Sequence, residues 1–164
     1  MKITLLKYCL ALLLLPALSG CAQLGYYGQA VQGQLSLLQK ARSVDSLIDS
    51  PDTPQQLKVR LQVAKQVRQF AVDELGLPDN RSYRNYTQLG QPYVLWNVVA
   101  TTRLSLTPLK WCFPVAGCVT YRGYYKYDAA QEFARQLRSE DYDVRIEGVP
   151  AYSTLGWFND PLLS

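Results

Sequence analysis

The chain contains no histidine among its 164 residues. Catalytic triads of the Ser-His-Asp type and Cys-His pairs both use an imidazole as the base. Zinc sites built on imidazole ligands need the same side chain. We therefore predict that this chain supplies no catalytic residue, no metal ligand and no cofactor site of its own.

Strong charge of either sign is also missing. The formal net charge is +4, and charged residues make up 18% of the sequence. Lys2 and Lys7 contribute two of those charges from a segment that we expect to be removed. So small an excess is not typical of nucleic-acid binding, and we expect no nucleic-acid partner. A hydrophobic content of 48% instead indicates one ordinary globular domain.

The first twenty residues have the order of a secretion signal. Lys2 and Lys7 flank the start of an apolar run that is too short to cross a ~30 Å hydrocarbon core. Small residues then lead to Cys21. We predict that residues 1–20 are a signal peptide. The pattern resembles the bacterial lipoprotein signal, in which the cysteine receives a diacylglycerol and becomes the mature N-terminus. The alternative is a plain secretory signal with a chance cysteine.

A lipid on Cys21 would define both the organisation and the location of the chain. Residues 21–28 would be a lipidated tether and residues 29–164 the folded part. Acyl chains contribute ~0.8 kcal/mol per buried CH₂, so several chains would hold the protein stably on a membrane. Ala22 is not the aspartate of an inner-membrane retention signal. We therefore expect a membrane-anchored protein of the cell envelope, on the periplasmic face of the outer membrane.

Two cysteines remain once Cys9 and Cys21 are accounted for. Cys112 and Cys118 are separated by a short segment that contains proline and glycine, which favour a tight reversal. Disulfides persist in exported proteins, so we predict a bridge between these two cysteines. The alternative is a metal or redox pair, for which the spacing is not the usual C-x-x-C.

Helical periodicity dominates the first half of the sequence. Apolar residues three or four apart predict one helix from Val31 to Ile48. A second helix is expected to start with Thr53 as its N-cap and Pro54 at its first position, and to stop at Gly76. Its expected buried stripe comprises Leu57, Leu61, Ala64, Val67, Ala71 and Leu75. Together these two helices would form an antiparallel hairpin.

The second half changes to a strand pattern. Residues 93–101 are apolar on both faces, which favours a central strand over an exposed edge. A strand-like run over 118–125, a helix capped by Asp128 and an alternating strand over 142–149 follow. The fold class is therefore α+β, with an N-terminal helical hairpin, a small sheet and a packed helix. Because residues 151–164 are rich in apolar side chains, we expect an incomplete domain.

Two long motifs carry a resemblance to a known family. They are residues 111–125 (WCFPVAGCVTYRGYY) and residues 151–164 (AYSTLGWFNDPLLS). Together with the lipoprotein cysteine at position 21, they resemble the predicted aminopeptidase family of bacterial lipoproteins. The resemblance extends over the whole mature chain.

This resemblance implies a lipid-anchored zinc hydrolase acting on peptides in the envelope. In that family we expect an HExxH helix to bind zinc and activate water, and we expect it to lie beyond residue 164. This chain would then be an inactive N-terminal part of a metallopeptidase. The candidate cleft residues that the resemblance suggests are Tyr121, Arg122, Gly123, Tyr152 and Ser153.

Two non-enzymatic interpretations remain open. The tyrosines at 121, 124, 125 and 127 could stack on a glycan or line a peptide groove, which would make the chain an envelope binding module. Their alternative role is ordinary strand packing. A structural lipoprotein that tethers a protein partner through its helical hairpin is the third hypothesis.

Overall fold

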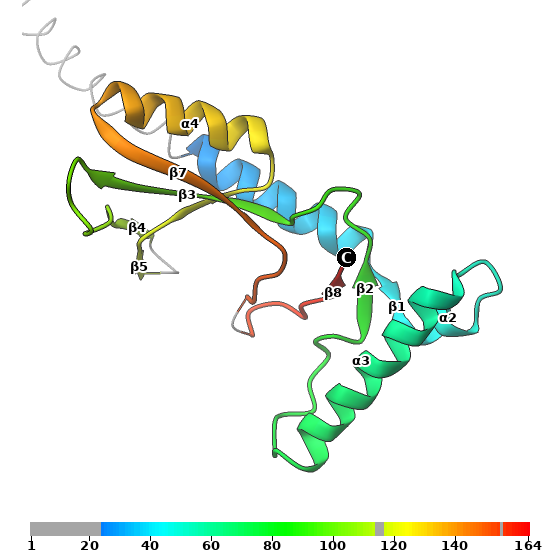
Figure 1. The fold of residues 1–164 in the computed structure, drawn as a ribbon. Coiled ribbons are helices and arrows are strands. Elements are labelled where there is room, and N and C mark those ends of the chain that lie inside the picture. The colour runs from blue at the N-terminus through cyan, green and yellow to red at the C-terminus, as the bar shows by residue number, and fades with distance from the viewer. Residues whose placement is uncertain (1–23, 114–116, 155) are drawn as a thin grey trace, which may run out of the picture. The chain divides into compact units, whose positions relative to one another are not determined.

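The computed structural model describes residues 24–113, 117–154 and 156–164 (Figure 1). The chain divides into two compact units, one that ends at Leu35 and one that covers Ser36–Ser164. A helix begins at residue 24 and ends at residue 39. Among the residues described, no helix is both long and apolar enough to cross a bilayer. The expected signal peptide and Cys21 lie outside the described residues.

The prediction of one helix from Val31 to Ile48 is wrong, because the helix is interrupted. Residues Arg42–Ser43 form strand β1, and a separate helix, α2, covers Val44–Asp49. Arg42 pairs with Tyr86 in strand β2 (Asn85–Thr87), and the Val44 N–H donates to the Arg84 carbonyl at 3.0 Å. This tertiary pairing overrides the helical periodicity of the segment. Val31 and Leu35, expected to be buried, are exposed.

A helical hairpin is present, but its first arm is short. Helix α2 packs against α3, which covers Gln55–Asp73. Pro54 occupies the N-cap position, and its carbonyl accepts hydrogen bonds from the N–H groups of Leu57 and Lys58. The expectation that Thr53 caps the helix is therefore wrong, and Thr53 is instead buried. The core of this part is formed by Val44, Leu47, Leu61 and Tyr86, with Ile48, Leu57 and Leu162 packed against it.

Only part of the stripe expected on α3 is buried. Leu61 is 2% exposed, whereas Val67 is 62% and Leu75 is 63% exposed. The reason is length, since α2 has 6 residues and α3 has 19. At 1.5 Å per residue, α2 spans about 9 Å of a helix that is about 28 Å long. The expectation of a stripe buried along the whole of α3 is corrected accordingly.

The second half contains the expected central strand. Strand β3 (Leu95–Thr102) lies between β6 (Arg122–Tyr124) and β7 (Tyr142–Val149), and both pairings are antiparallel. Helix α4 (Tyr127–Ser139) runs along one face of this sheet (Figure 1). Val98, Ala100, Ala130 and Ala134 are buried between helix and sheet. Asp128 lies in the first turn of α4 and not at its cap, which is Lys126.

A glycine is required where an aromatic side chain crosses the sheet. A Cβ atom added to Gly148 would lie 2.3 Å from the Tyr93 ring, too close for any contact. The Tyr93 ring packs edge-on against Trp96, and Trp96 in turn contacts Tyr127 at the start of α4. Gly148 thus allows these rings to close one end of the layer between helix and sheet.

The predicted strand over 118–125 is divided into two. Strand β4 (Trp111–Phe113) pairs with β5 (Gly117–Val119) in a hairpin of its own, and β6 follows separately. Cys112 and Cys118 are directly opposite each other in this hairpin, and the structure joins them by a disulfide with their Cα atoms 3.9 Å apart. In the chain-entropy treatment, a loop of this length contributes about 2 kcal/mol of stability.

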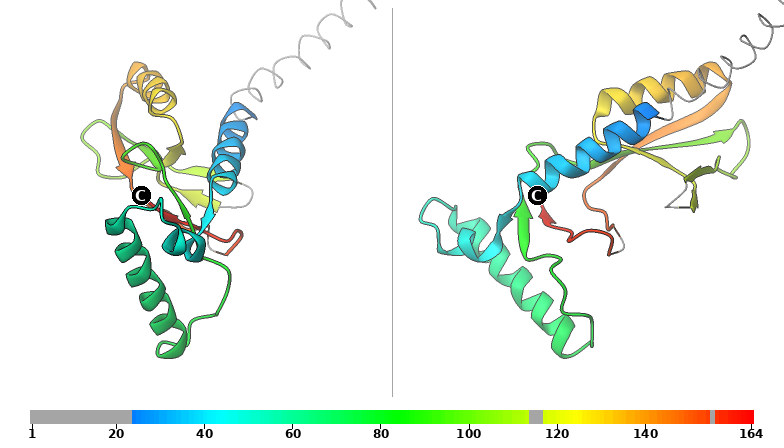
Figure 2. Two further views of the ribbon diagram at one scale, coloured as in Figure 1. Left: turned by 90° about the vertical axis from the view of Figure 1, so that its right-hand side faces the viewer. Right: turned by 180° about the vertical axis from the view of Figure 1, so that it is seen from behind.

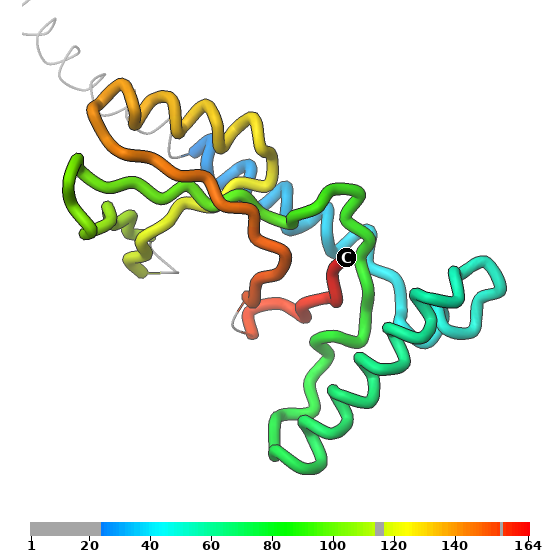
Figure 3. The backbone as a smooth tube through the Cα atoms, viewed as in Figure 1, coloured from blue at the N-terminus to red at the C-terminus, as the bar shows by residue number. Residues whose placement is uncertain are grey.

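The last described residues return to the first half of the chain. After β7, the backbone runs back to strand β2, as the tube in Figure 3 shows. Strand β8 (Leu162–Leu163) pairs with β2 in parallel and completes the three-stranded sheet β1-β2-β8 (Figure 2). Both leucines are half-buried, whereas Trp157 is 72% exposed. Together, the helices and the small sheets confirm the predicted α+β class.

Candidate functional site

The first three candidate cleft residues lie on two faces of the sheet. The Arg122 guanidinium lies over the Phe133 ring of α4, 4.7 Å from its centroid, and so points toward the helix. Because side chains alternate along a strand, Gly123 faces the other side, where an added Cβ would lie 3.2 Å from Asn97 Oδ1. The Tyr121 side chain is 45% exposed. A single cleft that includes all three stays a prediction.

One contact brings the two motif segments together. The hydroxyl groups of Tyr125 and Tyr152 are 2.7 Å apart, and their rings meet edge-on. Burial, together with the hydrogen bond to Tyr125, raises the pKa of the Tyr152 phenol well above its ordinary value. Tyr152 is therefore neutral at physiological pH and acts as a hydrogen-bonding group. It is not poised to serve as a base.

Asp160 holds the second motif in shape. Its carboxylate accepts a hydrogen bond from the Thr154 N–H at 2.9 Å, from Thr154 Oγ1 at 2.6 Å and from Ser153 Oγ at 3.2 Å. The Asp160 carbonyl accepts a bond from the Tyr83 N–H at 2.7 Å. Asp160 is 6% exposed, so these donors compensate for the loss of water around a buried carboxylate. Sequence reasoning missed this residue, although its neighbours Ser153 and Thr154 supply the matching donors.

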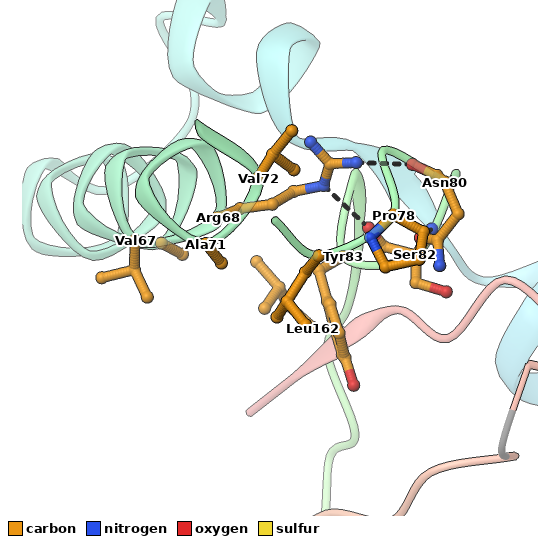
Figure 4. Close-up of a pocket in the computed structure, with 11 residues that line it drawn as sticks. Val67, Arg68, Ala71, Val72, Pro78, Asn80, Ser82, Tyr83 and Leu162 are labelled. Atoms are coloured by element: carbon orange, nitrogen blue, oxygen red, sulfur yellow. Dashed lines mark hydrogen bonds between the residues drawn. The ribbon is translucent and has the colours of Figure 1, made fainter. Parts of the chain in front are cut away.

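Among the described residues, a cavity lies beside α3, away from the candidate cleft residues. It is a groove of about 430 Å³ between the second half of α3, the segment 77–83 and strand β8. Figure 4 shows side chains from all three segments around it. Its apolar walls include Val67, Ala71, Val72, Leu77, Tyr83 and Leu162. Its size falls within the ~300–1,000 Å³ typical of ligand sites.

Arg68 fixes one wall of this groove. Its Nε donates to the Ser82 carbonyl at 3.1 Å and its Nη2 to the Asn80 carbonyl (Figure 4). Nη2 also donates to Asp79 Oδ1. The guanidinium of Arg68, with that of Arg84, lowers the pKa of the Asp79 carboxyl. The Arg68 side chain is 16% exposed. It therefore belongs to a structural clamp.

The groove suits an apolar side chain, because its walls are largely apolar and the polar side chains of Arg68 and Asn80 are already hydrogen-bonded within the protein. Arg68 donates to acceptors of segment 79–82, and the Ser82 N–H donates to Asn80 Oδ1. The walls that remain available are aliphatic and aromatic. The groove can thus bind a ligand by burial of apolar surface.

The described residues do not fit a catalytic zinc ion. A catalytic zinc site uses three protein ligands and leaves one position open for water. Residues 24–113, 117–154 and 156–164 contain no group of three histidine, cysteine, aspartate or glutamate side chains that could hold a metal. The full sequence has no histidine to contribute, and Cys112 and Cys118 are bonded to each other.

Comparison with known protein families decides the general kind of protein. A family model described as "Putative aminopeptidase" matches residues 25–164. The chain belongs to this aminopeptidase family. The match includes both motif segments, the disulfide hairpin and the Asp160 network. Searches of curated proteins and of solved structures found no match.

Family membership therefore rests on nearly all of the folded chain and not on one motif. The apolar groove and the Tyr125–Tyr152 contact are the two features that a ligand could use. They come from different halves of the sequence.

The raised Tyr152 pKa predicts a loss of stability in alkali. In the unfolded chain the phenol ionises near pH ~10, whereas in the folded chain it stays neutral to higher pH. Its contribution is therefore complete below pH ~10 and falls as the pH rises beyond that value. We expect the gap in unfolding free energy between wild type and Tyr152→Phe to narrow from pH 8 to pH 11 in urea titrations. Tyr121→Phe, which alters an exposed phenol, is the control, and an unchanged Tyr152→Phe gap would contradict the prediction.

Proposed function

We propose that this chain is the N-terminal, non-catalytic part of a lipid-anchored zinc aminopeptidase that hydrolyses peptides in the cell envelope. The observation that carries the proposal is the family match over residues 25–164. The composition supports the division of labour, because a chain without histidine cannot provide the HExxH zinc ligands. Zinc and its activated water would then be supplied by a segment outside these residues.

The part of the enzyme described here would bind and orient the substrate. Its groove beside α3 can take an apolar residue of a peptide, and Arg68 keeps the wall of that groove in place. Tyr152 and Ser153 lie on a segment that Asp160 fixes, so their hydroxyl groups would have defined positions toward a ligand. Pre-organised contacts of this kind lower the entropic cost of binding.

A second candidate function uses the same surface without hydrolysis. The chain would then be an envelope lipoprotein that binds peptide or glycan, or tethers a protein partner. The groove favours peptide among these ligands, because its walls are apolar and its polar groups are already paired. Binding of a peptide by this chain, with no full-length relative showing hydrolysis, would favour this candidate.

The proposed lipid anchor depends on Cys21. A diacylglycerol on its thiol would place the folded residues at the periplasmic face of the outer membrane. The supporting observations are the positive and apolar segments before Cys21 and the small residues Ser19 and Gly20.

Replacement of Cys21 by alanine should leave an unprocessed precursor. The Cys21 thiol is the proposed lipid acceptor, and removal of residues 1–20 would depend on its acylation. Mass spectrometry of membrane fractions should show acylated Cys21 at the N-terminus of the wild-type protein and the intact signal in Cys21→Ala. Cys9→Ala is the matched control and should process normally. Normal processing of Cys21→Ala would contradict the anchor.

Aminopeptidase activity should require more than this chain. We expect the purified 164-residue chain with added zinc to release no amino acid from a panel of aminoacyl amides. A longer family member that carries an HExxH segment should release them, and a chelator should abolish its activity. Chelator-sensitive turnover by the short chain would overturn the assignment of a non-catalytic role. Absence of turnover by the longer protein would overturn the proposed hydrolysis.

A further inference from the structure

Helix α3 carries an apolar stripe on the side away from its core. Val59, Val63, Val67 and Phe70 are 48%, 51%, 62% and 56% exposed. Their spacings of four, four and three residues place them on one face over about three turns. A continuous exposed stripe of this kind marks an interaction surface more often than scattered apolar residues do. We call these four residues the α3 stripe; Val67, at its edge, also lines the groove beside the second half of α3.

The α3 stripe is distinct from the residues that hold α3 to its own unit. Leu57 and Leu61 contact the core, Arg68 is clamped by segment 79–82, and Lys65 pairs with Asp45 of α2. These residues lie on the opposite side of the helix. A helix that is apolar on two sides is expected to be covered on both.

The charges next to the stripe are arranged against the helix's own dipole. Arg60 lies near the N-terminal end of α3, and Asp73 and Glu74 lie at its C-terminal end, where acidic groups are unfavourable. Among the described residues, neither Arg60 nor Glu74 forms an ion pair within the folded unit. Fourteen positions separate these two residues, which is about four turns, so they lie along the same edge of the stripe.

We propose that the α3 stripe binds the α3 stripe of a second copy of this chain, with the two helices antiparallel. In this arrangement Val63 faces the partner's Val67, and Val59 faces the partner's Phe70. The stripe is almost unchanged when its direction is reversed, as an isologous contact requires. Arg60 then lies about one helical turn from the partner's Glu74. The twofold symmetry places the same pair, Glu74 with the partner's Arg60, at the other end of the interface. In a parallel arrangement, Arg60 would face the partner's Arg60.

The charge pattern selects this occupant. An antiparallel copy provides an acidic end for each basic end, and it also brings the two helix dipoles into a favourable orientation. A helix of about 28 Å with four exposed apolar residues offers less surface than the interface of an obligate dimer. The dimer is therefore weak in solution, and attachment of both copies to one membrane would raise their effective concentration.

Charge reversal at the edge of the stripe tests the pairing. The full-length chain is purified in detergent, and its dimer dissociation constant is measured by sedimentation equilibrium. Two exposed ion pairs are worth about a threefold to tenfold change in that constant. Arg60→Glu alone and Glu74→Arg alone should each weaken the dimer by about this amount. The double variant Arg60→Glu/Glu74→Arg should restore wild-type affinity, because the reversed charges are again complementary.

Substitutions within the stripe test its apolar contact. Val63→Glu/Val67→Glu should abolish the dimer while the far-ultraviolet circular dichroism stays unchanged, because both side chains are exposed. Leu106→Glu is the matched control, since Leu106 is 100% exposed and lies outside α3. A monomer at every concentration would overturn the proposal and leave the stripe to a different protein. A dimer that survives Val63→Glu/Val67→Glu, or charge reversals that do not compensate, would also overturn it. None of these outcomes depends on peptide hydrolysis.

Discussion

The hydrogen bonds of Asp160 are the constraint on which the arrangement of Ser36–Ser164 depends. Its carboxylate fixes Ser153 and Thr154, and its carbonyl binds the Tyr83 N–H. The segment after β7 therefore reaches strand β2 in a defined conformation. Strand β8 can then pair with β2, although it has only 2 residues and could not hold this position through its own ladder.

The groove beside α3 follows from the same constraint. Leu162 of β8 and Tyr83 form the wall opposite α3. The Tyr83 N–H donates to the Asp160 carbonyl, and Leu162 follows Asp160 by two residues. Arg68 fixes the remaining side through the carbonyls of Asn80 and Ser82. A proposed peptide site in this family member is thus built from segments far apart in the sequence. Its rigidity comes from buried polar contacts, because the apolar walls alone do not specify one geometry.

Sequence patterns correctly predicted the elements that depend on residues close together in the chain. Strand 142–149 and the central position of strand 95–102 follow from alternation and from apolar character on both faces, and the structure confirms both. The break near residue 40 could not be predicted, because it depends on pairing of Arg42 with Tyr86. The exposure of Val67 depends on the length of α2, which the same break determines. Asp160 and Arg68 were missed because each combines side-chain and backbone partners that only the fold brings close, and a sequence pattern does not show which groups meet.

Hydrogen exchange of Asp160→Ala tests this dependence most directly. Removal of the buried carboxylate takes the hydrogen-bond acceptor away from the exposed Ser153 and the half-buried Thr154, and we expect the unfolding free energy to fall by about 2 kcal/mol. The amides of Thr154 and Tyr83 should lose most of their protection, whereas those of β3 should exchange faster only by the factor that the lower global stability sets. Asp143→Ala, at an exposed position of β7, is the control and should change neither quantity. Unchanged stability and unchanged protection at Thr154 and Tyr83 in Asp160→Ala would contradict the central role of Asp160.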